Sequence, residues 1–350
     1  MVSSALAPGQ WDVVGHDAAI TMLRQGVDRG DLAHAYLLSG PPQVGKGTIA
    51  RELALALVCE PGPGEVAPCR RCPQCRLALS GSHPDVSTVA RLPDKRDITV
   101  DQIRQMEGRV GLRPYQARRS VQIIREANLL NEAAANALLK TLEEPPGHAL
   151  LLLTATDEEA LSATIRSRCQ ALALRPVPPA RIAAWLEGRC GTAPSQARTL
   201  AALSAGRPGW AYQAASSPQL VGEHDALVQR VGGLLDLEVK ARVQAVPGFL
   251  DRDSFNENRQ MAATVLDLLL RWVRDLLVIA EGLPELVVYT RHFERLEEQA
   301  ARLTRGGIRD AVALLRQAAD DVERNVTPRL VLEALLVRLP TASAGAARRR

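Results

Sequence analysis

Short apolar runs alternate with helix-like segments over the first half of the chain. Three runs have the length of strands, and two segments between them have helical spacing: residues 35–39, 46–58, 120–124, 131–144 and 150–154. The three runs are apolar almost throughout instead of alternating with polar residues, which is typical of strands buried on both faces. Strands that alternate with helices predict an α/β domain with a parallel sheet between helical layers.

Beyond residue 176 the strand-like runs end and helical spacing takes over. Apolar positions such as Leu266, Leu269 and Val273 follow the helical period. The pattern predicts three structured units and a tail: an α/β domain over 1–176, a small helical domain over 177–220, a larger helical domain over 221–340, and residues 341–350. The tail contains Thr, Ala, Ser, Gly and Arg only and is expected to be disordered.

A phosphate-binding loop lies between the first predicted strand and the helix that follows it. Gly40, Gly45 and Lys46 match the pattern in which backbone amides and one lysine hold the phosphates of a nucleotide. The next position normally carries Ser or Thr as a magnesium ligand, but here it is Gly47. Thr48 comes one residue late and, on a helix, is turned by about 100°. Recruitment of Thr48 to the metal is the alternative.

The second magnesium-binding element is also altered. The apolar run 121–124 leads into Arg125 and Glu126, so that a cation stands where the metal-side carboxylate is expected. Glu126 remains a candidate base for polarising water. A guanidinium repels magnesium, and without the ion most transition-state stabilisation is lost. ATP or ADP is a candidate ligand and Mg²⁺ is not expected, unless Arg125 is a harmless variant of a working site.

Four of the six cysteines lie together in a segment rich in Pro and Gly: Cys59, Cys69, Cys72 and Cys75. Their spacing suits tetrahedral thiolate ligation of Zn²⁺. Disulfides and an iron–sulfur cluster are the alternatives, the first disfavoured in a reducing compartment. Cys169 and Cys190 are expected to be buried apolar thiols. A turn over 82–85 is expected to precede a further strand.

Composition limits the class of protein without deciding it. The chain has 350 residues and a net charge of +4, which argues against a dedicated polyanion binder. The most apolar run, 265–280, contains four charged residues and is not expected to span a membrane. No secretory signal is recognised at residues 1–10, so a cytoplasmic protein is expected.

Several segments together carry a family resemblance: residues 34–40, the cysteine insertion, 83–85, 131–146 and 167–169. The chain resembles the delta-prime subunits of bacterial DNA polymerase III clamp loaders, which are AAA+ proteins. The resemblance is clear over about 10–215 and weak over 325–339. It implies that 177–220 is the helical lid domain and 221–340 the helical collar, which serves oligomerisation.

The resemblance also implies roles for single residues. Arg168, in Ser167-Arg168-Cys169, would be an arginine finger acting in trans on the ATP site of an adjacent subunit. Thr156 would occupy the polar position that senses the γ-phosphate. Gly209 falls where ATP-hydrolysing relatives carry a sensor arginine. The implied partners are tau/gamma and delta subunits in a pentameric ring, the sliding clamp and primer–template DNA.

The combined expectation is a non-hydrolysing clamp loader subunit, part of the DNA polymerase III holoenzyme, that supplies Arg168 to a neighbour and helps load the clamp during replication. One alternative is a tau/gamma-type motor subunit, against which Gly47 and Arg125 argue. Another is a zinc-stabilised interaction or DNA-binding protein that kept the fold as a scaffold, which leaves Arg168 without a role.

Overall fold

The computed structural model describes residues 6–93, 95–159, 161–251, 255–324 and 326–340. They form two compact units, Met1–Ser216 and Ser217–Arg350. The expected disordered tail, 341–350, lies outside the described residues. The boundary expected near residue 176, between an α/β domain and a separate lid, remains a prediction, because both parts fall in the first unit.

A five-stranded parallel sheet forms the centre of the first unit, with the strand order β2-β3-β4-β1-β5. Its strands are β1 (Ala35–Ser39), β2 (Val86–Val89), β3 (Ser120–Ile124), β4 (Ala149–Ala155) and β5 (Gln170–Ala173). The predicted strands at 35–39 and 120–124 are confirmed, and the third is one residue longer at each end. The edge strand β5 was not predicted; its apolar residues are mainly alanines, which have low strand propensity, and most of the strand is exposed.

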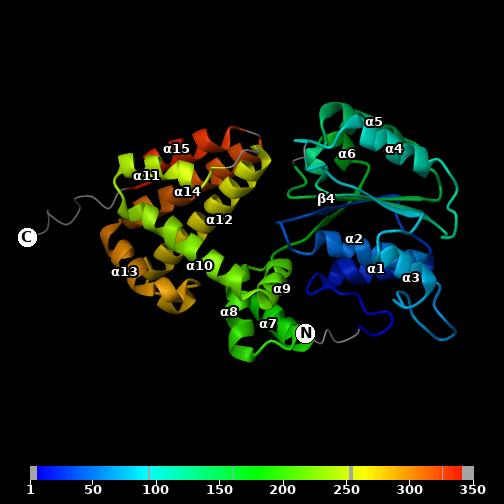
Figure 1. Ribbon diagram of the computed structural model, residues 1–350, viewed down its shortest axis with the longest axis horizontal. Coiled ribbons are helices and arrows are strands. Elements are labelled where there is room, and N and C mark those ends of the chain that lie inside the picture. Colours follow the sequence, from blue (N-terminus) through cyan, green and yellow to red (C-terminus); the bar gives the residue numbers. More distant parts are fainter. Residues whose placement is uncertain (1–5, 94, 160, 252–254, 325, 341–350) are drawn as a thin grey trace, which may run out of the picture. The chain divides into compact units, whose positions relative to one another are not determined.

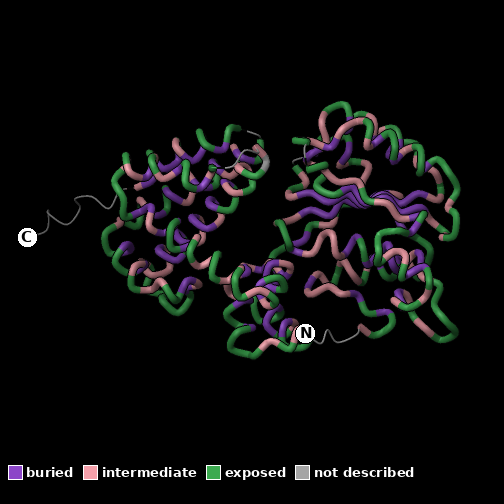
Figure 2. Tube along the Cα trace, viewed as in Figure 1, coloured by how far each residue is buried: buried purple, intermediate pink, exposed green. Residues whose placement is uncertain are grey.

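Helices cover both faces of this sheet (Figure 1): α1 (Asp17–Arg29) and α2 (Lys46–Val58) on one face, α4 (Val100–Val110) and α5 (Glu132–Glu143) on the other. Successive strand residues point to opposite faces. Leu37 packs on the α4–α5 side and Leu38 on the α1–α2 side. The strands at the centre are therefore buried throughout, as Figure 2 shows, which accounts for their continuous apolar character.

The first unit ends with three helices, each beginning with a proline in its first turn: α7 (Pro179–Cys190), α8 (Pro194–Ser204) and α9 (Pro208–Ser216). Two ion pairs connect α7 to the N-terminal segment. Arg181 pairs with Asp17, and Arg189 donates through Nε and Nη2 to the two carboxylate oxygens of Asp12, both at 3.2 Å. Two short helices, α3 (Pro73–Leu79) and α6 (Ala163–Arg166), complete the unit.

A turn between α3 and β2 holds the loop that follows α4. The carboxylate of Asp85 accepts hydrogen bonds from the backbone N–H groups of Tyr115, Gln116 and Ala117 at 2.6–2.8 Å. Burial alone would raise the pKa of Asp85, but these three donors outweigh it and lower the pKa. The expected turn before a strand is thus confirmed, and Asp85 has a structural part in it.

The second unit is helical: α10 (Pro218–Gly233), α11 (Val239–Ala245), α12 (Phe255–Ala280), α13 (Phe293–Arg302), α14 (Arg305–Glu323) and α15 (Pro328–Arg338). Trp272 of α12 lies at its centre. Its Nε1 donates to Gln299 at 2.7 Å, and Gln299 donates to the carbonyl of Gly232 at 3.0 Å. A Cβ at Gly232 would lie 2.5 Å from the Trp272 ring, so the glycine permits this close packing. In the described part of the chain, no helix is long and apolar enough to cross a membrane.

Candidate functional site

The phosphate loop begins at Gly40, directly after β1, in a conformation that only glycine can adopt here. Its φ is 141°, and a Cβ would lie 2.2 Å from the carbonyl oxygen of Leu174. The Gly40 N–H points at the carbonyl oxygens of Ala155 and Thr156, both at 3.2 Å. The loop is therefore fixed to the carboxyl ends of β4 and β5 at its first residue.

Lys46 begins α2 and folds back over the loop. Its Nζ donates to the carbonyl oxygen of Gly40 and, at 2.8 Å, to that of Pro41. Burial lowers the pKa of Lys46 to about 8, and the negative charge of Glu126 partly opposes this shift. The ammonium group is thus held on the backbone carbonyls of the phosphate loop. Its charged form is less stable than in water, because burial removes part of its hydration.

A cavity of about 1330 Å³ opens beside the loop. It is lined by all but one of the residues predicted to bind nucleotide: Gly45, Lys46, Gly47, Thr48, Glu126 and Thr156. Gly40 lies at the base of the loop and is not part of the lining. The structure therefore gathers these residues at one site, while their role in binding remains a prediction.

The end of β3 brings two charged side chains to the same cavity. Arg125 donates its backbone N–H to the carbonyl of Val89 at 2.8 Å, and its side chain lines the cavity together with that of Glu126. Glu126 has φ 53°, an uncommon value outside glycine. Its N–H donates to Thr154 Oγ1 at 3.0 Å, which holds the turn. Arg125 is thus placed at the site expected for a metal ligand.

Residues of the helices after the sheet also line the cavity; of these, Gly209 was expected near the site from the resemblance, whereas Trp185, Tyr212 and Gln213 were not predicted. Trp185 and Tyr212 have ring centroids 5.8 Å apart, and both line it. The N–H of Gly209 donates to the carbonyl of Gln43 at 3.0 Å, and the Gln43 side chain donates to Gln213 at 3.2 Å. These residues are far from the loop in sequence, so no local pattern could have indicated the contact.

Arg168 lies away from this cavity, just after α6. Its Nη2 contacts Glu143 Oε1 at 2.8 Å, and its Nη1 donates to the carbonyl of Thr164 at 3.0 Å and to Ser167 Oγ at 3.3 Å. About a third of the side chain remains exposed. The guanidinium is thus held by the ends of α5 and α6 and is still accessible. The pairing with Glu143 was not predicted.

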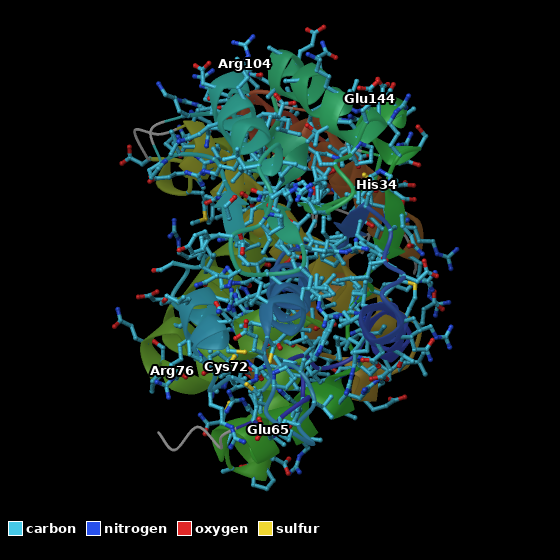
Figure 3. All side chains as sticks on the ribbon, turned by 90° about the vertical axis from the view of Figure 1, so that its right-hand side faces the viewer. His34, Glu65, Cys72, Arg76, Arg104 and Glu144 are labelled. Carbon is cyan, nitrogen blue, oxygen red and sulfur yellow. The ribbon has the colours of Figure 1, made fainter. Side chains whose placement is uncertain are left out.

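The four predicted cysteine ligands are brought together at the start of α3. Their Sγ atoms all lie within 4.8 Å of one another, and Cys72 is the N-cap of α3 (Figure 3). The backbone N–H groups of Cys69, Cys72 and Cys75 each donate to the sulfur of another cysteine of the set. All six cysteines are free thiols, so the disulfide alternative is not supported. The group can hold one metal ion.

The other two cysteines differ from expectation. Cys169 and Cys190 are half-buried and not fully buried. Cys169 packs against the core beneath the α4–α5 side of the sheet. Burial raises the pKa of the Cys169 thiol to about 11. Cys190 is the last residue of α7, whereas Cys169 lies in the turn between α6 and β5.

Comparison with known proteins defines the relationship. A family model described as DNA polymerase III, delta subunit, matches residues 15–178. The delta-prime subunit of Pseudomonas aeruginosa is 38% identical over 182 residues, covering 51% of this chain and 55% of that protein. The delta-prime subunit of Bacillus subtilis is 27% identical over 321 residues, covering 91% and 94%. The gamma/tau subunit of Mycobacterium tuberculosis is 31% identical over 362 residues, covering 95% and 61%.

The parallel sheet, the phosphate loop after β1 and the helices on both faces define an α/β protein of the P-loop class, followed by a helical region. In sequence the chain is delta-prime-like: it is similar to delta-prime and gamma/tau subunits of DNA polymerase III. It spans about 61% of the length of the gamma/tau relative.

Lys46 is predicted to titrate separately from the other three lysines of the chain, Lys95, Lys140 and Lys240. Its pKa of about 8 means that it loses its charge between pH 7 and 9. Reductive ¹³C-methylation labels the four lysines and the α-amino group, which also titrates near pH 8; in the NMR titration one lysine signal, assigned by its loss in the variant below, should have a midpoint near pH 8. Lys46→Arg should remove that signal and leave the others unchanged. A midpoint near the usual lysine value of about 10.4 for all four signals would contradict the burial argument.

Proposed function

We propose that this chain is a non-hydrolysing subunit of the DNA polymerase III clamp loader. In this role Arg168 enters the ATP site of an adjacent subunit and stabilises the charge on the γ-phosphoryl group as it is transferred. The subunit thereby helps to load the sliding clamp on primed DNA. The accessible guanidinium of Arg168, held outside the chain's own nucleotide cavity, is the observation that carries this proposal.

The residues around the chain's own cavity support the non-hydrolysing part. Gly47 offers no side chain to a magnesium ion, and Arg125 offers a cation in place of a carboxylate. Magnesium bridges the phosphates and neutralises developing charge in P-loop enzymes. Two of the usual protein ligands are therefore missing at once, whereas Lys46 and the loop amides remain to hold phosphate.

The implied partners follow from the relatives. Delta-prime and gamma/tau proteins are subunits of DNA polymerase III, so we infer a ring in which this chain adjoins a tau/gamma-type and a delta-type subunit. In this assembly 177–220 acts as the lid and 221–340 as the collar that holds subunits together. Such a complex works on primer–template DNA in the cytoplasm.

A motor subunit of the tau/gamma type is the second candidate, and one observation favours it. The gamma/tau relative is 31% identical over 95% of this chain, whereas the Bacillus subtilis delta-prime subunit is 27% identical over 91%. Against it stand Gly47 and Arg125. Hydrolysis by the chain itself distinguishes the two candidates.

We further propose that the four-cysteine cluster holds Zn²⁺. Four thiolates bound to zinc at about 2.3 Å lie roughly 3.8 Å apart in a tetrahedron, which agrees with sulfur atoms that all lie within 4.8 Å. The cluster packs on Leu55 of α2, so that the metal would fix α3 against the helix that follows the phosphate loop.

Arg168→Ala is predicted to fold and assemble normally but to lower ATP hydrolysis by the neighbouring subunit. An arginine finger is worth roughly 10³- to 10⁵-fold at its own site in well-studied cases. The loss in total turnover will be smaller, because other sites in the ring keep their fingers. The measurement is DNA- and clamp-stimulated ATPase of the reconstituted complex, together with clamp loading.

The matched control for this experiment is Arg329→Ala, which removes another exposed Arg–Glu pair, that with Glu333 at 2.8 Å. It should leave turnover unchanged. Arg168→Lys should not restore activity, since an ammonium group lacks the planar fork that meets phosphate oxygens. A complex with Arg168→Ala that assembles and hydrolyses ATP at the normal rate would exclude the finger.

The purified chain alone is predicted to show no magnesium-dependent ATP turnover above background, because Gly47 and Arg125 replace two metal ligands. Phosphate release is measured on protein freed of contaminating ATPases, with Lys46→Ala as the background control. The double change Gly47→Ser with Arg125→Asp tests the argument in the opposite direction. Turnover by the unmodified chain that Lys46→Ala abolishes would favour the motor subunit.

Cys72→Ser is predicted to release zinc and to loosen residues 59–79, while the sheet stays folded. The four thiolates bind only when folding brings them together, so metal and local order are linked. Elemental analysis gives the metal content, and hydrogen exchange reports local order. Cys190→Ser, which changes a half-buried thiol outside the cluster, is the matched control. Reduced native protein without zinc would refute the proposal.

A further inference from the structure

The cavity beside the phosphate loop carries an excess of positive charge. Four cationic side chains line it: Lys46, Arg51, Arg109 and Arg125. Two acidic side chains, Asp12 and Glu126, also line it, and Asp12 is already paired with Arg189. The walls therefore favour an anion with several negative charges.

The sheet register places Arg125 close to the phosphate loop. Ile124 of β3 is aligned with Leu153 of β4, so that Arg125 is level with Thr154, and Thr154 is aligned with Leu38 of β1. Strands in a sheet lie about 4.8 Å apart. The backbone of Arg125 is thus roughly 10 Å from the end of β1, where the loop begins, and Arg125 is exposed and lines the cavity that the loop also lines.

That space is where a metal bound to the phosphates would be held. A carboxylate at this position attracts magnesium. The Arg125 guanidinium stands in place of that carboxylate, and it supplies the positive charge that the magnesium ion would otherwise add. A guanidinium also donates up to five hydrogen bonds in a geometry that matches phosphate oxygens. A fixed cation therefore stands where the diffusible one would bind.

Part of the cavity wall is apolar and aromatic. Val13, Val14, Trp185 and Tyr212 line it, and Tyr212 is 43% exposed. Aromatic rings of this kind offer a face on which a planar base can stack. The combination of cationic and aromatic lining residues fits a nucleotide better than an inorganic polyphosphate.

We propose that this cavity binds a nucleoside di- or triphosphate without a divalent cation, and that Arg125 neutralises the phosphate charge that magnesium would otherwise neutralise. Lys46 and the loop amides hold one side of the phosphates, and Arg125 holds the other. The inference builds on the proposed function, because a nucleotide bound in this way stays intact and leaves Arg168 as the chain's contribution to hydrolysis.

The test is a titration of the full-length chain, freed of bound nucleotide, with N-methylanthraniloyl-labelled ADP and ATP. Magnesium is omitted in one series and added in excess in the other. It is omitted and not chelated, because a chelator would also remove a metal from the four cysteines. Binding should be at least as tight without magnesium as with it.

Two variants of Arg125 sharpen the result. Arg125→Ala should weaken metal-free binding by roughly ten- to a hundredfold, the usual value of a hydrogen bond to a charged group. Arg125→Asp should abolish metal-free binding and make the remaining binding depend on magnesium. Arg104→Ala, on α4 and not in the cavity lining, is the matched control and should bind as the unmodified chain does. Melting temperatures verify that each variant is folded.

Three outcomes would overturn the proposal: binding that requires magnesium, no binding in either series, or inorganic triphosphate binding as tightly as ATP. A loss of affinity in Arg104→Ala equal to that in Arg125→Ala would also count against it. None of these results bears on the arginine finger, which is measured as hydrolysis by the neighbouring subunit. Failure here and failure of the trans role are therefore separate.

Discussion

The close approach of Gly40 to the ends of β4 and β5 is the contact on which the site depends. With Leu174 O only 2.2 Å from the position of a Cβ, no other residue fits at position 40. The Gly40 N–H then fixes the loop to the carbonyls that end β4. The carboxyl ends of parallel strands lie at one edge of the sheet. The start of α2 and the turn after β3 therefore lie at the same edge as Gly40, and both line the same cavity.

Much of this arrangement could be predicted from sequence because its causes are local. Strands buried on both faces must be apolar throughout, and the four cysteines lie close enough in sequence for spacing alone to indicate a cluster. The edge strand Gln170–Ala173 gives only a weak signal, because its apolar run is short and made mainly of alanine, and three of its four residues are exposed. Contacts between distant segments, such as Arg168 with Glu143 and Gly209 with Gln43, depend on packing that no local pattern encodes.

The three residues on which the proposed lack of hydrolysis rests come from three separate elements of the fold. Gly47 lies on α2, Arg125 after β3 and Gly209 on α9. At Gly209 the reason is steric: a Cβ would lie 3.1 Å from the carbonyl oxygen of Gln43, which accepts the glycine's own N–H. A Cβ there would require the Gln43 backbone to shift by a few tenths of an ångström. The glycine that makes the direct contact between α9 and the loop has no side chain that could reach the phosphates.

Arg168, the proposed finger, and the cavity are held by different parts of the same unit. Arg168 takes its position from Glu143 at the end of α5 and from the carbonyl of Thr164 in α6, both on the side of the sheet covered by α4 and α5. The cavity lies at the carboxyl edge, against α2 and α9. No contact of Arg168 passes through Lys46, Gly47 or Arg125. Changes that remove magnesium ligands from the cavity thus leave the guanidinium in place, and action on a neighbouring site does not require hydrolysis at the chain's own.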